Sequence, residues 1–229
     1  MKFKSSGQRL SPLLVIAAIS SLAACSSPAK TSSADAPARA DQGSKNVAAV
    51  KLDAKPREVA AVKEVEAYDD VPTMTASSDL VIRGRVTQIT PGRHIGSSGM
   101  DGQRVRDVAI KIEQVFLNKT GTTPATVTLD EWGWDDRGHG FQIEGVTWSN
   151  AGDENYYFLR RIDEGRFRLV STQGRVSVKG SRLSPTAAED SPVHEAVERQ
   201  SETAFRASLR KASADYRAGR LRAVPVPSQ

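Results

Sequence analysis

The sequence predicts a mainly β domain, arranged as an antiparallel barrel or sandwich, followed by one C-terminal helix. Three observations lead to this prediction. Apolar and polar residues alternate in several short segments between residues 78 and 180, as in half-buried strands. Turn-forming residues separate these segments, and no helical spacing lies between them, which argues against a parallel sheet with crossover helices. After residue 190 the apolar residues instead recur at helical spacing.

The first predicted strand is SDLVIRGRVTQI, residues 78–89. Leu80, Ile82 and Val86 share one face of this strand, and Val81 lies on the other. Gly84 in its middle indicates a bulge or a tight bend. Further strands are predicted at residues 104–117, 125–132, 154–162, 165–170 and 174–180.

The predicted helix begins at Ser191, which can cap it, with Pro192 at its first position and Glu195 in its first turn. Gly219 is a plausible stop signal. We expect the apolar stripe of this helix to pack on the strands. The stripe consists of Val193, Val197, Ala204, Phe205, Leu209, Ala212 and Tyr216.

The first 24 residues have the pattern of a secretory signal peptide. Lys2, Lys4 and Arg9 precede a short apolar run, residues 11–24, which ends in small residues. This run is too short and too rich in alanine and serine to predict a membrane-spanning helix. The single cysteine of the chain, Cys25, follows at once.

The motif Leu22-Ala23-Ala24-Cys25 resembles the lipobox of bacterial lipoproteins. The resemblance implies a diacylglyceryl group on the Cys25 sulfur, cleavage just before Cys25 and, usually, acylation of the new N-terminus. It implies a protein anchored by lipid to a membrane of the bacterial cell envelope, on the non-cytoplasmic side. The alternative is an ordinary secretory signal whose removal leaves a free thiol.

The remaining chain is predicted to have four parts. Residues 25–70 form a lipidated, disordered tether, because their composition offers few large apolar groups to bury. Residues 71–183 form the β domain, residues 184–219 the helical segment, and residues 220–229 a loose tail. No nucleic-acid partner is expected: without residues 1–24 the chain has 29 Lys and Arg against 27 Asp and Glu, and these charges are mixed along it.

Four segments of the core carry a second resemblance: SDLVIRGRV, VAIKIEQVFLNKTG, YYFLRRI and GRFRLV. They resemble uncharacterised bacterial exported and lipid-anchored proteins, over about residues 72–180. Their domain is similar to the OB fold and to netrin-like inhibitor domains, which implies a small Greek-key barrel. The netrin-like resemblance also suggests protease inhibition, although such domains commonly rely on disulfides and a chain with one cysteine can form none internally.

Residues 129–148, LDEWGWDDRGHGFQIEGVTW, combine acidic side chains with all three tryptophans. One hypothesis is a metal site for a hydrolase, because clustered carboxylates can bind hard cations. The spacing matches neither a calcium loop nor a zinc motif, and a polar turn is the simpler interpretation. A second hypothesis is an acid pair for glycoside cleavage, Glu131 and Glu144. The residues that could serve as ligands are Asp130, Glu131, Asp135, Asp136, His139 and Glu144.

Trp132 and Trp134 are the candidate binding residues. If the strand continues that far, they share one face, and exposed indole rings can bind sugar or peptide groups. Alternatively, one or both close the end of the barrel. Trp148 is expected in the core, because Val146 lies two residues before it.

No catalytic motif, metal site or cofactor site is assigned from the sequence. No Gly-x-Ser-x-Gly elbow or glycine-rich phosphate loop occurs. The expected function is therefore a binding or interaction module of the cell envelope, with an envelope protein or a glycan as partner. The alternatives are a metal-dependent hydrolase that uses the acidic loop 130–144 and a netrin-like protease inhibitor.

Overall fold

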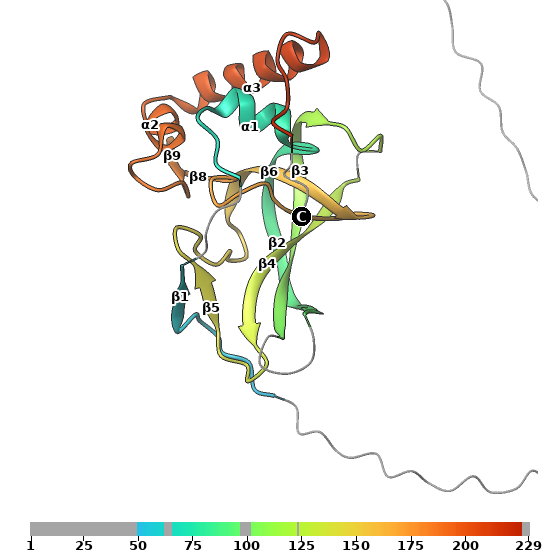
Figure 1. The fold of residues 1–229 in the computed structure, drawn as a ribbon, viewed down its shortest axis with the longest axis vertical. Helices are drawn as coiled ribbons and strands as arrows, with labels where there is room; N and C mark the ends of the chain where they lie inside the picture. The colour runs from blue at the N-terminus through green and yellow to red at the C-terminus, as the bar shows by residue number, and fades with distance from the viewer. Residues whose placement is uncertain (1–49, 62–65, 97–101, 123, 226–229) are drawn as a thin grey trace, which may run out of the picture. The chain divides into compact units, whose positions relative to one another are not determined.

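The computed structural model describes residues 50–61, 66–96, 102–122 and 124–225. Contacts divide the chain into two units, residues 1–47 and residues 48–229, and all described residues belong to the second. The predicted signal peptide and Cys25 lie outside the described residues. The described part is mainly β with three helices, so the predicted fold class is confirmed at this level (Figure 1).

Five strands pair in a ring. β2 (Leu80–Ile95), β3 (Gln103–Asn118) and β4 (Thr126–Asp135) are antiparallel neighbours in chain order. β4 then pairs in parallel with β7 (Arg166–Leu169). β7 pairs with β6 (Glu154–Asp163), and β6 pairs with the first half of β2, which completes the ring. The strands predicted by alternation are all present.

Four short strands lie outside the ring. β8 (Arg175–Lys179) pairs with β6, and β9 (Arg182–Pro185) pairs with β8, so the sheet continues past the ring. β1 (Glu58–Ala60) and β5 (Phe141–Ile143) form a separate parallel pair. The sequence analysis did not predict β1, β5 or β9, which are three or four residues long.

The three helices lie together at one end of the strands, whereas β1 and β5 lie toward the other end (Figure 1). They are α1 (Val71–Ser77), α2 (Pro192–Glu198) and α3 (Glu202–Arg217). None of the helices in the described ranges is long and apolar enough to cross a bilayer. Sequence analysis did not predict α1.

The prediction of one C-terminal helix is wrong in one respect, because the segment forms two helices. Ser201 begins the second of them: its hydroxyl oxygen accepts a hydrogen bond from the backbone N–H of Ala204, at 3.2 Å. Ser191 makes no such cap, because its hydroxyl oxygen accepts a hydrogen bond from Gln173 Nε2 at 2.8 Å. The predicted C-terminal helix is otherwise present.

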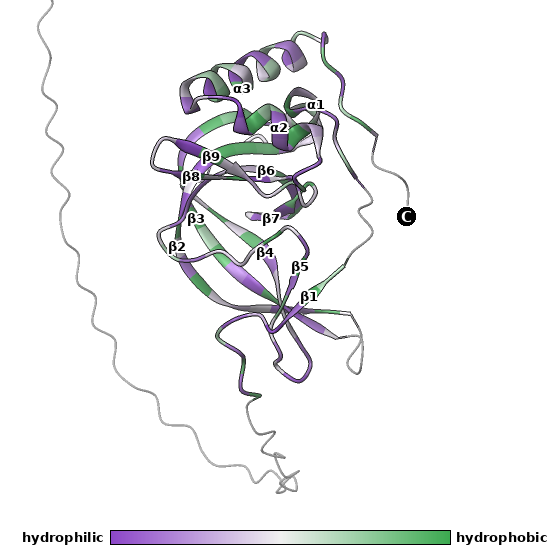
Figure 2. Cartoon of the chain, turned by 90° about the vertical axis from the view of Figure 1, so that its left-hand side faces the viewer, coloured by the Kyte–Doolittle hydropathy of each residue, from purple (hydrophilic) through white to green (hydrophobic). Residues whose placement is uncertain are grey.

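The strands of the ring pack two apolar clusters, one on each face. The inner cluster fills the ring, and the outer cluster joins the strands to the helices, where Figure 2 shows hydrophobic residues gathered. As predicted, Leu80, Ile82 and Val86 belong to the inner cluster and Val81 to the outer one. The remaining buried members of the inner cluster are Val108, Ile110, Val127, Leu129, Tyr157, Leu159 and Phe167.

The sequence analysis predicted a disordered tether over residues 25–70. This prediction is wrong for the described residues from 50 onward, because they pack on the β domain. The carbonyl oxygen of Asp53 accepts a hydrogen bond from Trp134 Nε1 at 2.8 Å, and β1 pairs with β5. Tyr68 is buried, and its backbone N–H donates to Gln173 Oε1 at 2.7 Å. These contacts are largely backbone hydrogen bonds, which composition does not reveal.

Gly84 lies at an irregularity of the β2–β3 pairing, as predicted, because the register shifts between Arg83 and Gly84. A Cβ atom on Gly84 would lie 2.5 Å from Ile110 Cγ2 and 2.8 Å from the carbonyl oxygen of Lys111. We expect Gly84→Ala to lower the free energy of unfolding by about 1–3 kcal/mol through overpacking. Urea denaturation measures this loss.

The control for this substitution is Gln88→Ala, at an exposed position of the same strand. We expect the control to change the free energy of unfolding by no more than about 0.5 kcal/mol. Equal stability of the Gly84 variant and the wild-type protein would show that β2 and β3 can separate here at no cost.

Candidate functional site

The strand pairing opens a pocket beside β4. β4 pairs with β7 only at Thr128 and Leu129, and its next described bridge on that side joins Trp134 to Gly140, so residues 130–133 have no partner strand there. A pocket of about 620 Å³ lies there, between residues 129–132 and residues 168–172. Its volume falls within the range of about 300–1,000 Å³ that is typical of ligand sites. We call it the Trp132 pocket.

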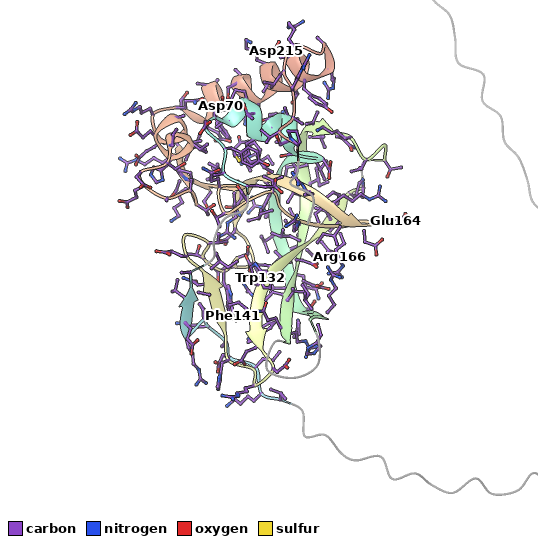
Figure 3. All side chains as sticks on the ribbon, viewed as in Figure 1. Asp70, Trp132, Phe141, Glu164, Arg166 and Asp215 are labelled. Carbon is purple, nitrogen blue, oxygen red and sulfur yellow. The ribbon has the colours of Figure 1, made fainter. Side chains whose placement is uncertain are left out.

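The wall of the Trp132 pocket is largely apolar. Trp132 stands at its edge with 38% of its surface exposed, and Phe141 of β5 lies next to it, with ring centroids 6.1 Å apart (Figure 3). Ile162, also 38% exposed, lies at the rim. Further apolar side chains of the wall are Ile95, Val105, Leu129, Ile143, Val146, Trp148, Leu169 and Val170.

A bulge in β4 directs Trp132 into this position. Trp132 pairs with Val105 and Trp134 with Arg104, while Gly133 between them has no partner in β3. Because Arg104 and Val105 are consecutive, their side chains point to opposite faces, and so do the two tryptophans. The expectation that Trp132 and Trp134 share a face is therefore wrong.

Gly133 is well suited to the bulge because a side chain has no room there. A Cβ atom on Gly133 would lie 2.7 Å from the carbonyl oxygen of Arg104 and 2.8 Å from Arg106 Cγ. The close approach of the β3 backbone thus requires glycine at this position.

Trp134 has a structural role. It is 6% exposed, and its indole packs edge-on against Trp148 with a centroid distance of 5.5 Å. Its Nε1–H donates to the carbonyl oxygen of Asp53, so it holds the segment before β1. Of the two candidate binding residues, only Trp132 presents its ring to solvent.

Glu131, which lines the pocket, belongs to a buried ionic cluster with Arg106, Arg175 and Ser149. Glu131 is 6% exposed and Arg175 is 3% exposed. The Glu131 carboxylate forms ion pairs with both guanidinium groups, at 3.0 Å for Arg175 Nη1. It also accepts hydrogen bonds from the backbone N–H and the hydroxyl of Ser149, at 3.0 Å and 2.8 Å.

The ionic cluster fixes the loop that carries Trp148. Arg106 Nη2 donates to the carbonyl oxygen of Ser149 at 3.0 Å, and Arg175 donates to the carbonyl oxygen of Thr147. The Arg106 guanidinium also lies over the Trp148 ring, 4.3 Å from its centroid. Burial lowers the pKa of Arg106. The half-buried position of Trp148 differs from the predicted core position.

Glu131 and Glu144 lie in different environments, one buried and one exposed. Both oxygen atoms of the Glu131 carboxylate accept hydrogen bonds from arginine side chains or Ser149, so both are already engaged. Glu144 is exposed in the turn after β5. A general acid must reach the substrate with a transferable proton, and neither residue has that environment here.

The other acidic residues of segment 130–144 are also engaged. Asp130 pairs with Arg93 and Arg166, at 2.9 Å and 2.5 Å. Asp135 accepts hydrogen bonds from two backbone N–H groups of its own turn and lies 3.3 Å from His139 Nδ1. Within the ranges that the structure describes, no three His, Cys, Asp or Glu side chains are grouped to hold a metal ion.

Sequence reasoning missed most of this site. Of the two candidate binding residues only Trp132 lies at the pocket edge, and Asp130 and Glu131 also line the pocket, whereas the opposite wall comes from β7 and the residues after it. The glycine between two tryptophans, in WGW, was the available signal for a bulge. No protein-family model matches the chain, and no curated protein sequence matches it.

Proposed function

We propose that the protein is a lipid-anchored binding protein of the bacterial cell envelope. The lipobox-like motif Leu22-Ala23-Ala24-Cys25 supports the anchor. A lipid on Cys25 holds the protein at the membrane, and the segment from residue 26 to about residue 49 links it to the β domain. The β domain then presents its pocket to a partner on the non-cytoplasmic side.

We infer that the ring is an OB-like Greek-key barrel. Numbered along the chain, the ring strands follow the order first, second, third, fifth, fourth and back to the first. The third and fifth of these strands, β4 and β7, are parallel, and the remaining pairs are antiparallel. This order and this single parallel pair are typical of OB folds, in which the second and third strands carry the ligand face.

The single observation that carries the binding function is the exposed Trp132 ring at the edge of a largely apolar pocket. Tryptophan is enriched at interaction hot spots, where a large ring fills or borders a pocket. The lining fits a partner protein that inserts a large apolar side chain, with Arg93 and Arg168 near the rim for polar contacts. Protease inhibition stays a prediction, drawn only from the netrin-like resemblance.

Photo-crosslinking in intact cells tests this function. A benzophenone amino acid in place of Trp132 would lie within reach of any occupant of the pocket. We expect discrete crosslinked partner bands after irradiation, which mass spectrometry identifies. The expected partner is an envelope protein.

The matched control carries the same amino acid in place of Arg210, which is exposed on α3. Bands that appear only with the photo-reactive group at position 132 support the proposal. The same bands from both positions, or none from position 132, contradict it.

A further inference from the structure

A second pocket, of about 540 Å³, shares only Trp148 with the Trp132 pocket. Its wall comes from β2, the loop before β6, the start of β6, β8 and the first turn of α3. The side chains that line it are mainly polar, in contrast to the Trp132 pocket. We call it the Asn155 pocket.

The carboxylates of the Asn155 pocket are already neutralised or hydrogen-bonded. Glu154 pairs with Arg83 and Arg85. Glu202 accepts hydrogen bonds from the Tyr156 hydroxyl at 2.8 Å and from Arg206 at 2.9 Å. The third carboxylate, Asp153, accepts a hydrogen bond from the backbone N–H of Asn150 at 2.8 Å. Within the described ranges no three potential metal ligands are grouped here.

Four polar side chains of the wall have hydrogen-bond donors or acceptors that no described residue uses. Asn155 is 2% exposed, and its amide nitrogen donates to the Tyr157 hydroxyl at 2.7 Å. Its carbonyl oxygen accepts no hydrogen bond from the residues that the structure describes. The side chains of Asn150, Ser177 and Lys179 likewise form no hydrogen bond with described residues.

This wall has the chemistry that recognises sugars. Each sugar hydroxyl both donates and accepts hydrogen bonds, and amide, hydroxyl and ammonium groups supply both roles. Aromatic side chains bind the apolar face of a sugar ring, and Trp148 is the aromatic residue of this wall, although Arg106 lies over its ring. Lys179 is the one cation of the wall without an acidic partner among the described residues. A phosphorylated ligand would therefore find only one positive charge here, which favours a sugar over a phosphate as the ligand.

We propose that the Asn155 pocket binds an oligosaccharide. Asn150, Asn155 and Ser177 bind ring hydroxyls, Trp148 contacts the apolar face of a sugar ring, and Lys179 binds an acidic substituent or a hydroxyl. The volume suits a short oligosaccharide, since small-molecule pockets span about 300–1,000 Å³. This site is separate from the Trp132 pocket and does not depend on its function.

Isothermal titration calorimetry on the full mature chain in detergent tests the proposal. The probes are maltotetraose and chitotetraose, which are neutral, and tetragalacturonic acid, which is acidic. We expect at least one probe to bind. Asn150→Ala and Lys179→Ala, both at exposed positions, are each expected to weaken that binding by about 3- to 10-fold, the loss of one hydrogen bond.

Trp132→Ala is the matched control and should leave the affinity for sugar unchanged, because it lies in the other pocket. Unaltered urea midpoints confirm that the variants are folded. Failure of all three probes to bind at millimolar concentration would overturn the proposal. So would binding that neither Asn150→Ala nor Lys179→Ala weakens, or binding that Trp132→Ala abolishes.

Discussion

Glu131→Gln is expected to lower the free energy of unfolding by about 3–5 kcal/mol, the usual cost of removing one partner from a buried ion pair. The amide keeps the shape of the side chain but removes the only carboxylate that pairs with Arg106 and Arg175 in the described structure. Two guanidinium groups would then stay buried without a counter-charge. Urea denaturation, followed by circular dichroism, measures the loss.

Glu144→Gln is the matched control, because Glu144 is exposed and lies in the same segment. Its free energy of unfolding should stay within about 0.5 kcal/mol of the wild-type value. A loss in the free energy of unfolding of less than about 1 kcal/mol for Glu131→Gln would contradict this prediction. It would show that water reaches the ionic cluster.

Cys25→Ala is expected to abolish incorporation of a fatty-acid label and to release the protein from the membrane fraction. Each buried methylene of an acyl chain contributes roughly 0.8 kcal/mol to membrane binding, and stable anchoring needs two signals, such as two acyl chains. Without the sulfur no chain is attached, and no helix in the described ranges can replace the anchor. Metabolic labelling with an alkyne fatty acid, followed by fractionation, measures both effects.

The control is Ser27→Ala, which leaves the motif Leu22-Ala23-Ala24-Cys25 intact. This variant should be labelled and membrane-bound like the wild-type protein. Unchanged labelling of Cys25→Ala would remove the basis for the anchor and leave the ordinary secretory signal as the explanation.

The longer strands were predictable because burial of one face leaves a local pattern. Leu80, Ile82 and Val86 pack inside the ring as their alternation predicts, and so do Val108 and Ile110. α1 and the two-stranded pair of β1 and β5 were not predictable. Their stability depends on partners far along the chain, as in the pairing of Val59 with Gln142, and such contacts leave no periodicity in a short segment.

Less of the site was predictable. The segment with three tryptophans drew attention to Trp132, but the bulge at Gly133 reverses the expected relation between Trp132 and Trp134. The ion pair of Glu131 with Arg175 joins residues 44 positions apart, and nothing near either residue indicates it. Acidic residues that looked like metal ligands in the sequence pair with arginines that come from other strands.

Successive residues of the same strand belong alternately to the inner and the outer apolar cluster. β2 gives Val81 to the outer cluster and Ile82 to the inner one, and β6 gives Phe158 to the outer cluster and Tyr157 to the inner one. Phe205 and Leu209 of α3 complete the outer cluster. The outer faces of β2 and β6 are therefore fully buried only when α3 packs on them during folding. We therefore expect folding to be a cooperative event that needs nearly the whole chain, from β2 to α3.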